Sequence, residues 1–383
     1  MYSARAPFPR GPNAFSARCQ AIRNSGVIAL DLTASNPTEV GLFADESWLR
    51  LLSKGESARY RPEPFGIASA RAAVAEAYAA RGLHVEPSQV ILSSSTSEAY
   101  SWVFALLCDP GDSILTPAPS YPLLHHLASL AHVRPRTYGI GYDGAYFIDL
   151  DSVRANLEPS TRAIVLISPN NPTGSFTRSD ELEALEALSL PIISDEVFAD
   201  FCLQPKPPDI PSALLAKHSL VFALGGLSKA YGWPQLKLAW IVVHGPVEQR
   251  REALARLELI ADTFLSVNTP VQEALADLVA FGRDRQQRIL RRLLANWRTI
   301  EQLTAGSPVT ARPVQGGWSS VLSLPLTEPG DWATALIERE HVLVQPGWFY
   351  DFDDDRLIVL SLLTPEADFT EGVTRIVNAS TGR

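Results

Sequence analysis

The sequence predicts an α/β fold, in which a large domain contains a mainly parallel seven-stranded sheet covered by helices and a smaller domain is α+β. Short apolar runs alternate with helical stretches from about residue 66 onward, a pattern typical of parallel strands joined by helices. The 383 residues also exceed what one hydrophobic core usually organises, so two domains are expected. We place the large domain at residues 41–275 and the small domain at residues 276–383, completed by an N-terminal arm at residues 1–40.

Each element follows from its own stretch of sequence, in chain order. Residues 1–30 are rich in arginine and proline and are expected to form an irregular arm. A helix is expected over residues 66–82, ending at Gly82, because glycine readily adopts the left-handed conformation that terminates helices. Seven apolar runs then predict the strands, at residues 89–92, 112–116, 134–138, 163–168, 190–194, 220–224 and 239–243.

Helices are expected between these strands, for example over residues 97–108 and 179–188. A long helix is expected over residues 271–304. The last stretch of about 80 residues mixes strand and helix patterns, as the smaller domain requires.

Composition excludes several classes of partner. The net charge is −9 and the pI is about 5.4, so the chain lacks the basic balance that binding to nucleic acid requires. No apolar run reaches the roughly 18 residues that span a bilayer, and no membrane partner is expected. The N-terminus has no apolar signal region, and Cys19, Cys108 and Cys202 are far apart, so we expect reduced thiols and a cytoplasmic protein. The seven histidines do not cluster with acidic residues, so no metal site is expected.

Polar side chains follow five of the predicted strands directly. A hydroxyl-rich turn, SSSTSEAY, follows the first strand, and Tyr121, Asn171, Asp195 and Lys229 follow four others. Each has an ordinary explanation alone, such as a serine that caps a helix. Ligands of parallel sheets, however, bind beyond the carboxyl ends of the strands. The set therefore predicts one binding site at that edge of the sheet.

Pyridoxal phosphate is the one ligand that explains the whole set. Its phosphate suits the hydroxyl-rich turn, where free backbone N–H groups and the helix dipole attract an anion. Its ring suits stacking on Tyr121, its ring oxygen suits Asn171, and its pyridine nitrogen suits the carboxylate of Asp195, which needs a partner when buried. Its aldehyde condenses with an amine, so Lys229 is expected to form a Schiff base.

The combined motifs resemble those of the class I and II aminotransferases, which are pyridoxal-phosphate enzymes of fold type I. The resemblance covers nearly the whole chain and rests on YRPEPFG, PGDSILTPAPSYP, SPNNPTG, SDEVFADF and LSKAYG. It implies that Ser95, Thr96 and Ser97 hold the phosphate and that Lys229 is the catalytic lysine and proton shuttle. It also implies that Tyr60 reaches the phosphate of a neighbouring subunit, so a homodimer with shared sites is expected.

Two further residues are implied to bind the substrate. Arg356 would hold the α-carboxylate as a bidentate fork, and Asn36 lies on a loop that approaches the substrate. Trp318, Trp348 and Phe15 either line the side-chain pocket or pack between the domains.

Three positions depart from the family pattern around the cofactor. Phe198 stands where the family usually has a tyrosine, and Lys237 stands where it usually has an arginine. Lysine keeps the charge but loses the planar fork. Gly226 replaces a frequent hydroxyl residue, although Ser228 lies nearby. These changes leave cofactor binding expected and its strength open.

The resemblance implies an aminotransferase that moves an amino group between an L-amino acid and a 2-oxo acid. Aspartate-specific members carry an arginine near the position of Thr263, and none stands there, so we expect a donor that is not a dicarboxylate. One alternative is another pyridoxal-phosphate reaction in a biosynthetic pathway, such as that of a C–S β-lyase, cyclase, racemase or decarboxylase. A ligand-sensing domain of a transcription regulator is the other, but the N-terminal arm is too short for a DNA-binding module.

Overall fold

The large domain is built on an eight-stranded sheet, in the strand order β2-β9-β8-β7-β6-β3-β4-β5. The computed structural model describes residues 3, 5, 11–27, 29–205, 212–326 and 331–381. All seven predicted strands are confirmed, as β2 (Val90–Ser93), β3 (Ser113–Ala118), β4 (Arg134–Tyr142), β6 (Thr161–Ile167), β7 (Ile192–Asp195), β8 (Val221–Gly226) and β9 (Ala239–His244). The eighth, β5 (Tyr146–Ile148), was not predicted because it is only three residues long.

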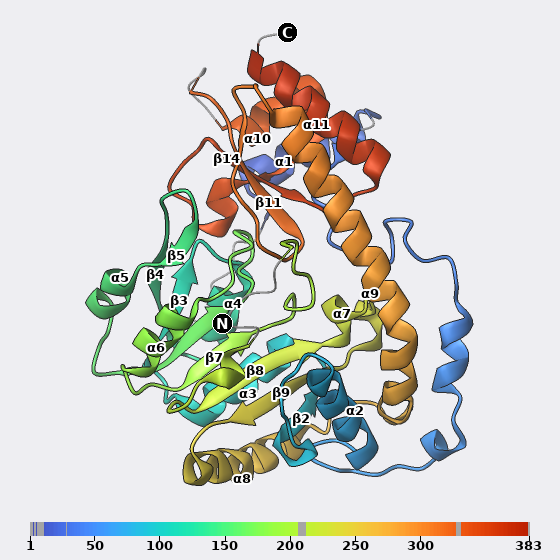
Figure 1. Cartoon of the computed structure of the whole chain (residues 1–383), viewed down its shortest axis with the longest axis vertical. Helices are drawn as coiled ribbons and strands as arrows, with labels where there is room; N and C mark the ends of the chain where they lie inside the picture. The colour runs from blue at the N-terminus through green and yellow to red at the C-terminus, as the bar shows by residue number, and fades with distance from the viewer. Residues whose placement is uncertain are drawn as a thin grey trace.

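The sheet is mainly parallel, as predicted. Strands β3, β4, β6, β7 and β8 pair in parallel, whereas β9 is antiparallel to both of its neighbours and β5 is antiparallel to β4. The parallel strands therefore end at a common edge, which faces the small domain (Figure 1). This edge carries the turns that hold the predicted site.

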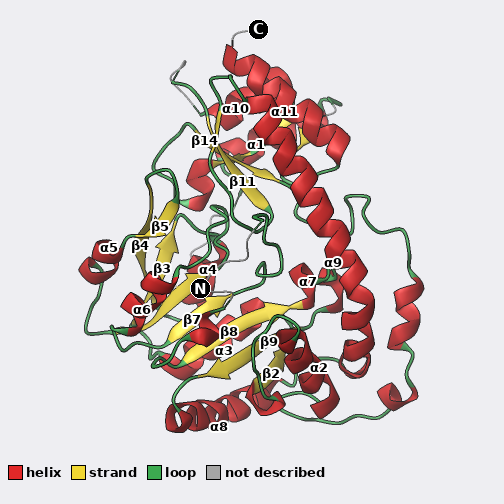
Figure 2. Cartoon of the chain, viewed as in Figure 1, coloured by secondary structure: helices red, strands yellow, loops and turns green. Residues whose placement is uncertain are grey.

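Helices cover both faces of this sheet (Figure 2). One face packs against α2 (Ala68–Ala79), α5 (Leu150–Ala155), α6 (Ser179–Glu186) and the first part of α9 (Thr269–Thr304). The other face packs against α3 (Thr96–Leu107), α4 (Leu123–Leu130) and α8 (Val247–Phe264). Side chains alternate along each strand, so β2 sends Val90 and Leu92 to the first face and Ile91 to the second.

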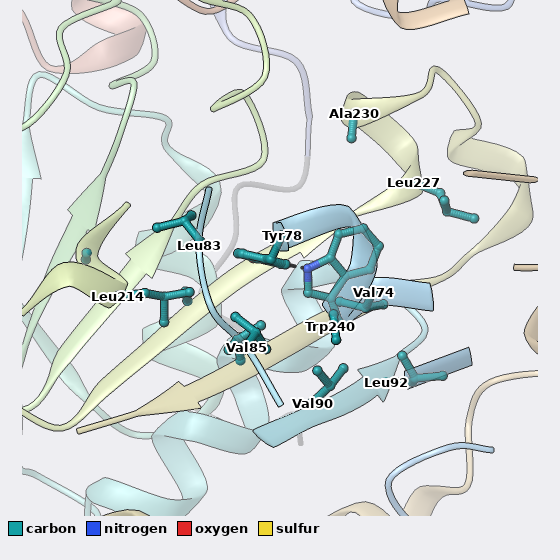
Figure 3. Packing of buried hydrophobic residues seen from close by; sticks show 14 of the residues in the cluster. Val74, Tyr78, Leu83, Val85, Val90, Leu92, Leu214, Leu227, Ala230 and Trp240 are labelled. Atoms are coloured by element: carbon teal, nitrogen blue, oxygen red, sulfur yellow. Dashed lines mark hydrogen bonds between the residues drawn. The ribbon is translucent and has the colours of Figure 1, made fainter. Parts of the chain in front are cut away.

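Figure 3 shows the first of these cores around Trp240 on β9. The ring of Trp240 lies among Val74, Leu92 and other apolar side chains, and its Nε1 donates a hydrogen bond to the hydroxyl of Tyr78 over 3.3 Å. A buried indole N–H needs such an acceptor, and Tyr78 on α2 supplies it. The contact joins α2 to the sheet.

The small domain contains a four-stranded antiparallel sheet, in the order β10 (Thr310–Ala311), β11 (Ser319–Ser323), β14 (Leu357–Ser361), β13 (Gln345–Pro346). A parallel pair, β1 (Leu30–Asp31) and β12 (Val342–Leu343), brings the N-terminal arm into this domain. The helices α1 (Ala14–Asn24), α10 (Trp332–Ala335) and α11 (Glu366–Thr381) belong to this domain, whereas α7 (Leu227–Ala230) directly follows β8 of the large sheet. The 36-residue helix α9 runs from the large domain to the small one (Figure 1).

The arm is not irregular throughout, and the prediction for residues 1–30 is wrong over Ala14–Asn24. These residues form α1, which begins after Asn13, whose side chain accepts a hydrogen bond from the N–H of Ser16. Cys19 on α1 packs against Ile337 and Leu343. The division of the chain at residues 275 and 276 stays a prediction, and α9 continues across it.

The long helices are not suited to a bilayer. Within the described part of the chain, no helix combines the length and the apolar character that crossing a membrane requires.

Candidate active site

A cavity of about 470 Å³ lies where the ends of the large-sheet strands meet β11, β13 and β14 of the small domain. The structure brings most of the predicted site residues to its wall. They are Ser95, Thr96, Ser97, Tyr121, Asn171, Asp195, Phe198, Ser228, Lys229, Lys237 and Trp318. Residues that lie far apart in the sequence, from 95 to 318, thus share one cavity.

One end of the cavity is suited to an anion. Ser95 caps α3, and its Oγ accepts a hydrogen bond from the N–H of Glu98 over 3.2 Å. Because Ser93 on β2 pairs with Ala239 on β9, Lys237, just before β9, lies at the same edge as this turn. The N-terminus of a twelve-residue helix and a lysine therefore attract negative charge to one place.

Asp195 ends β7 and presents its carboxylate to the cavity. Burial raises the pKa of Asp195 to about 6, although hydrogen bonds from the N–H of Val197 and the hydroxyl of Tyr100, both 3.2 Å long, act in the opposite direction. A carboxylate removed from water in this way gains from a protonated nitrogen beside it.

Tyr100 is a site residue that the sequence reasoning missed. It lies on α3, four residues after Thr96, and its hydroxyl donates to Asp195. Side chains four residues apart share one face of a helix, so the face that continues the hydroxyl-rich turn was the available signal.

Lys229 lies on α7 with its amine against aromatic rings. Its Nζ is 5.0 Å from the centre of a Trp318 ring and 5.8 Å from the centre of the Phe198 ring. Burial lowers the pKa of Lys229, and the charge of Asp195 acts against this shift. A lowered pKa increases the fraction of neutral amine, which is the nucleophilic form.

Asn171 is oriented by a residue of the small domain. Ser319 on β11 donates its hydroxyl to Oδ1 of Asn171 over 3.1 Å. With its oxygen engaged, the amide of Asn171 has its NH₂ group available to donate into the cavity. Ser319 was also missed, although its neighbour Trp318 was singled out in the same GGWSS segment.

Arg356 does not line the cavity, and the expected position of this arginine is wrong. Its Nε and Nη2 donate to the two oxygens of Asp354 over 2.9 and 2.8 Å, and its side chain is about half exposed (46%). The acidic turn before β14 binds the guanidinium locally. On the strand itself, Val359 and Ser361 line the cavity instead.

Asn36 is also absent from the cavity wall. Its Oδ1 accepts hydrogen bonds from the N–H and the hydroxyl of Thr38, which closes a local turn. Its neighbours Thr33 and Ser35 line the cavity in its place.

Three aromatic residues lie outside this cavity. Tyr60 is 76% exposed, so its expected contact with a neighbouring subunit stays a prediction. Phe15 and Trp348 stack edge to face, with ring centres 6.3 Å apart, and pack against each other. Of the three candidates for the side-chain pocket, only Trp318 lines the cavity.

The residues in the cavity fit pyridoxal phosphate. The anion site at α3, the aromatic ring of Tyr121, the carboxylate of Asp195 and the amine of Lys229 match the groups of this cofactor one by one. Phe198 has no group that could donate a hydrogen bond to the ring oxygen of the cofactor, so that contact would fall to the NH₂ group of Asn171. Among the described residues, no cluster of His, Cys, Asp and Glu suits a metal ion.

Comparison with known proteins gives consistent results. The family described as "Aminotransferase class I and II" matches residues 30–376. The glutamate-pyruvate aminotransferase AlaA of Escherichia coli K12 is 32% identical over 272 residues, which are 70% of this chain and 66% of that enzyme. An alanine aminotransferase of Mycobacterium tuberculosis is 29% identical over 365 residues, which are 93% of this chain and 80% of that enzyme.

Solved structures show the same fold. An alanine aminotransferase from Pyrococcus furiosus superposes with a TM-score of 0.86 at 23% identity, and the match covers 100% of both chains. A tyrosine aminotransferase from Leishmania infantum gives a TM-score of 0.83 at 23% identity, covering 98% of this chain and 99% of that one.

Proposed function

The chain belongs to the class I and II aminotransferase family, and from that premise we propose that it is an aminotransferase whose reaction takes place in the cavity around Lys229. The family is one of pyridoxal-phosphate-dependent enzymes. The observation that carries the proposal is the meeting of three groups in one cavity: the amine of Lys229, the carboxylate of Asp195 and the anion site at the start of α3.

Each of these residues has a separate task. When bound, pyridoxal phosphate supplies an electron sink for negative charge at the carbon that bears the amino group. Lys229 would attach the cofactor and afterwards move a proton at that carbon. Asp195 would keep the pyridine nitrogen protonated, and Tyr121 would bind the ring. The start of α3, with Lys237, would hold the phosphate.

The donor and acceptor are proposed to be compounds with no second carboxylate. Among the described residues that line the cavity, the cations are Lys229 and Lys237, and both serve the cofactor. Thr263, near the position expected for an arginine in aspartate-specific members, lies on α8 and donates its hydroxyl to the carbonyl of Leu259. A side-chain carboxylate thus has no cationic partner among these residues.

A homodimer with shared sites remains part of the proposal. The high exposure of Tyr60 supports it, because a tyrosine that serves a neighbouring subunit projects from its own chain. A cytoplasmic location is also proposed, and it is consistent with Cys19, Cys108 and Cys202, none of which forms a disulfide within the described residues.

A half-reaction screen tests the proposed function. Purified protein with its cofactor is mixed with single amino compounds, and the absorbance band of the lysine-bound cofactor is followed. Loss of the band on adding a donor, and its return on adding a 2-oxo acid, is the expected result. Release of pyruvate and ammonia without any oxo acid would instead identify a β-lyase. Lys229→Ala is the control that should show neither change.

A further inference from the structure

The cavity wall on the small-domain side carries no positive charge in the described part of the chain. The charged residues that line the cavity as a whole are Asp195, Lys229 and Lys237, and all three come from the large domain. Lys229 is committed to the cofactor, and Lys237 lies at the anion site beside Ser95. Arg356, the one arginine expected here, is bound by Asp354 outside the cavity.

The strand that was expected to supply the arginine supplies apolar surface. Val359 lies in the middle of β14, between Val321 of β11 and Gln345 of β13. It is 1% exposed and belongs to a cluster with Tyr350 and Phe349, both of which also line the cavity. Leu360 continues the apolar lining from the same strand.

The polar groups on the small-domain side of the cavity are uncharged, and some of them are already hydrogen-bonded within the protein. The hydroxyl of Ser361 donates to the carbonyl of Ala34, and the hydroxyl of Ser319 donates to Asn171. The amide of Gln345, the hydroxyl of Ser35 and the hydroxyl of Thr33, which donates to Asp31, complete the set. Such groups can bind a hydroxyl or an amide, but an ionised carboxylate moved here from water would gain no counter-charge.

We propose that the amino donor of one half-reaction is a primary amine whose reacting carbon carries no carboxylate. That carbon bears hydrogen, an alkyl group or an uncharged polar group, and the rest of the molecule is apolar. This inference rests on the proposed function and names the substrate class of the same cavity.

The exchange balances with a 2-oxo acid as the second reactant. The carbon–nitrogen bond of the donor breaks, and its carbon is oxidised by two electrons to a carbonyl. The carbonyl carbon of the 2-oxo acid is reduced by two electrons and takes the nitrogen. Water consumed in the first half-reaction is released in the second. The carboxylate of the 2-oxo acid meets the same uncharged wall, so its KM is expected to be high.

A matched set of donors tests this inference. L-leucine, L-leucinamide, L-leucinol and 3-methylbutylamine share one side chain and differ at the carboxylate position. We expect kcat/KM for the half-reaction to be about tenfold or more higher for the three compounds that lack a carboxylate than for L-leucine, because leaving a buried charge unpaired is costly. As a binding measurement, calorimetric titration with 4-methylpentanoate should give no detectable heat of binding.

Two variants test whether the uncharged residue at position 359 causes the preference for donors without a carboxylate. Val359→Arg places a guanidinium in the cavity wall and should raise the ratio of L-leucine to 3-methylbutylamine kcat/KM by about tenfold or more. Arg356→Leu is the matched control and should leave that ratio unchanged. If Val359→Arg does not fold, the comparison of the four donors with the wild-type protein still tests whether the cavity favours amines without a carboxylate.

The two proposals fail in different ways. If L-leucine reacts faster than the three compounds that lack a carboxylate, the proposed function stands and this inference is overturned. If no donor of either class removes the absorbance band, the proposed function is overturned and this inference falls with it.

Discussion

At the scale of single residues, burial shifts the pKa values of Asp195 and Lys229 in the directions that favour the neutral form of each side chain. Burial raises the pKa of Asp195 to about 6 and lowers the pKa of Lys229. Both shifts follow from removing charge from water, and the mutual attraction of the two groups only partly offsets them. A cationic ring nitrogen held by Asp195 and a covalent link at Lys229 would relieve both costs.

Asp195→Asn should therefore stabilise the cofactor-free protein at neutral pH. The raised pKa means that the folded state binds a proton more tightly than the unfolded state, whose Asp pKa is about 3.9. The wild type thus loses stability as pH rises from about 4 to about 6, by up to about 2–3 kcal/mol. Asparagine carries no such penalty.

Urea unfolding of both cofactor-free proteins at several pH values measures this difference. The gap in unfolding free energy should be small near pH 4 and should widen to a plateau above pH 7. A gap that does not change with pH would show that the pKa of Asp195 is not raised. In the cofactor-loaded protein, the same substitution should reduce turnover by orders of magnitude, because the ring nitrogen loses its counter-charge.

At the scale of elements, the turn between β6 and α6 fixes the position of Asn171. Gly174 in this turn has a positive φ of 70°, and an added Cβ would lie 2.6 Å from the carbonyl oxygen of Gly316 and against Val314. The turn is thereby packed against the segment that leads to β11. Ser319 on β11 then orients the amide of Asn171.

Gly174→Ala should destabilise the protein by about 1–3 kcal/mol or more, because both the backbone conformation and the close contact oppose a side chain. It should also weaken cofactor binding, since Asn171 moves with the turn. Denaturant unfolding and equilibrium dialysis of the cofactor measure the two effects. Gly41→Ala is the matched control: its φ is also 70°, but a Cβ there meets nothing within 4 Å. Equal losses in the two variants would mean that the contact with Gly316 contributes nothing.

At the scale of the whole molecule, the proposed homodimer makes each active site depend on two chains. Tyr60 projects into solvent at 76% exposure and lies outside its own chain's cavity. If it serves the neighbouring phosphate, Tyr60→Ala and Lys229→Ala affect the same site from opposite chains.

Mixed dimers of these two variants test that arrangement. One site in each mixed dimer combines native Tyr60 with native Lys229, while the other site lacks both. Unfolding and refolding the two variants together should therefore restore cofactor retention and turnover above the level of either variant alone. Turnover equal to the average of the two separate proteins would contradict the sharing of sites.

Most of the fold could be predicted because each strand or helix is indicated by a pattern within its own short stretch of sequence. The seven strands are apolar runs, and the helix predicted over residues 66–82 is found as α2 (Ala68–Ala79), with Gly82 just beyond its end at a φ of 78°. Helix α1 was missed because its sequence, AFSARCQAIRN, carries only a weak apolar face, and its packing on Ile337 and Leu343 stabilises it. The three residues of β5 are too few to give a pattern.

The site was predictable wherever a strand end delivers a side chain, and not where contacts between distant segments decide. Tyr100 and Ser319 act through hydrogen bonds to Asp195 and Asn171, and the sequence alone does not identify these partners. Arg356 was misplaced because one carboxylate two residues away binds it first. Whether Arg356 binds Asp354 or a group in the cavity depends on the folded geometry, which the sequence alone does not give.

The central claim is that Lys229 is the covalent anchor of pyridoxal phosphate. The most direct measurement is reduction of the cofactor-loaded protein with borohydride, which fixes the cofactor on the amine that holds it, followed by peptide mapping. The label should be found on the peptide that contains Lys229, and it should be absent from Lys229→Ala, whose circular dichroism spectrum should match that of the wild type. A label on any other lysine, or the same labelling in the variant, would contradict the account.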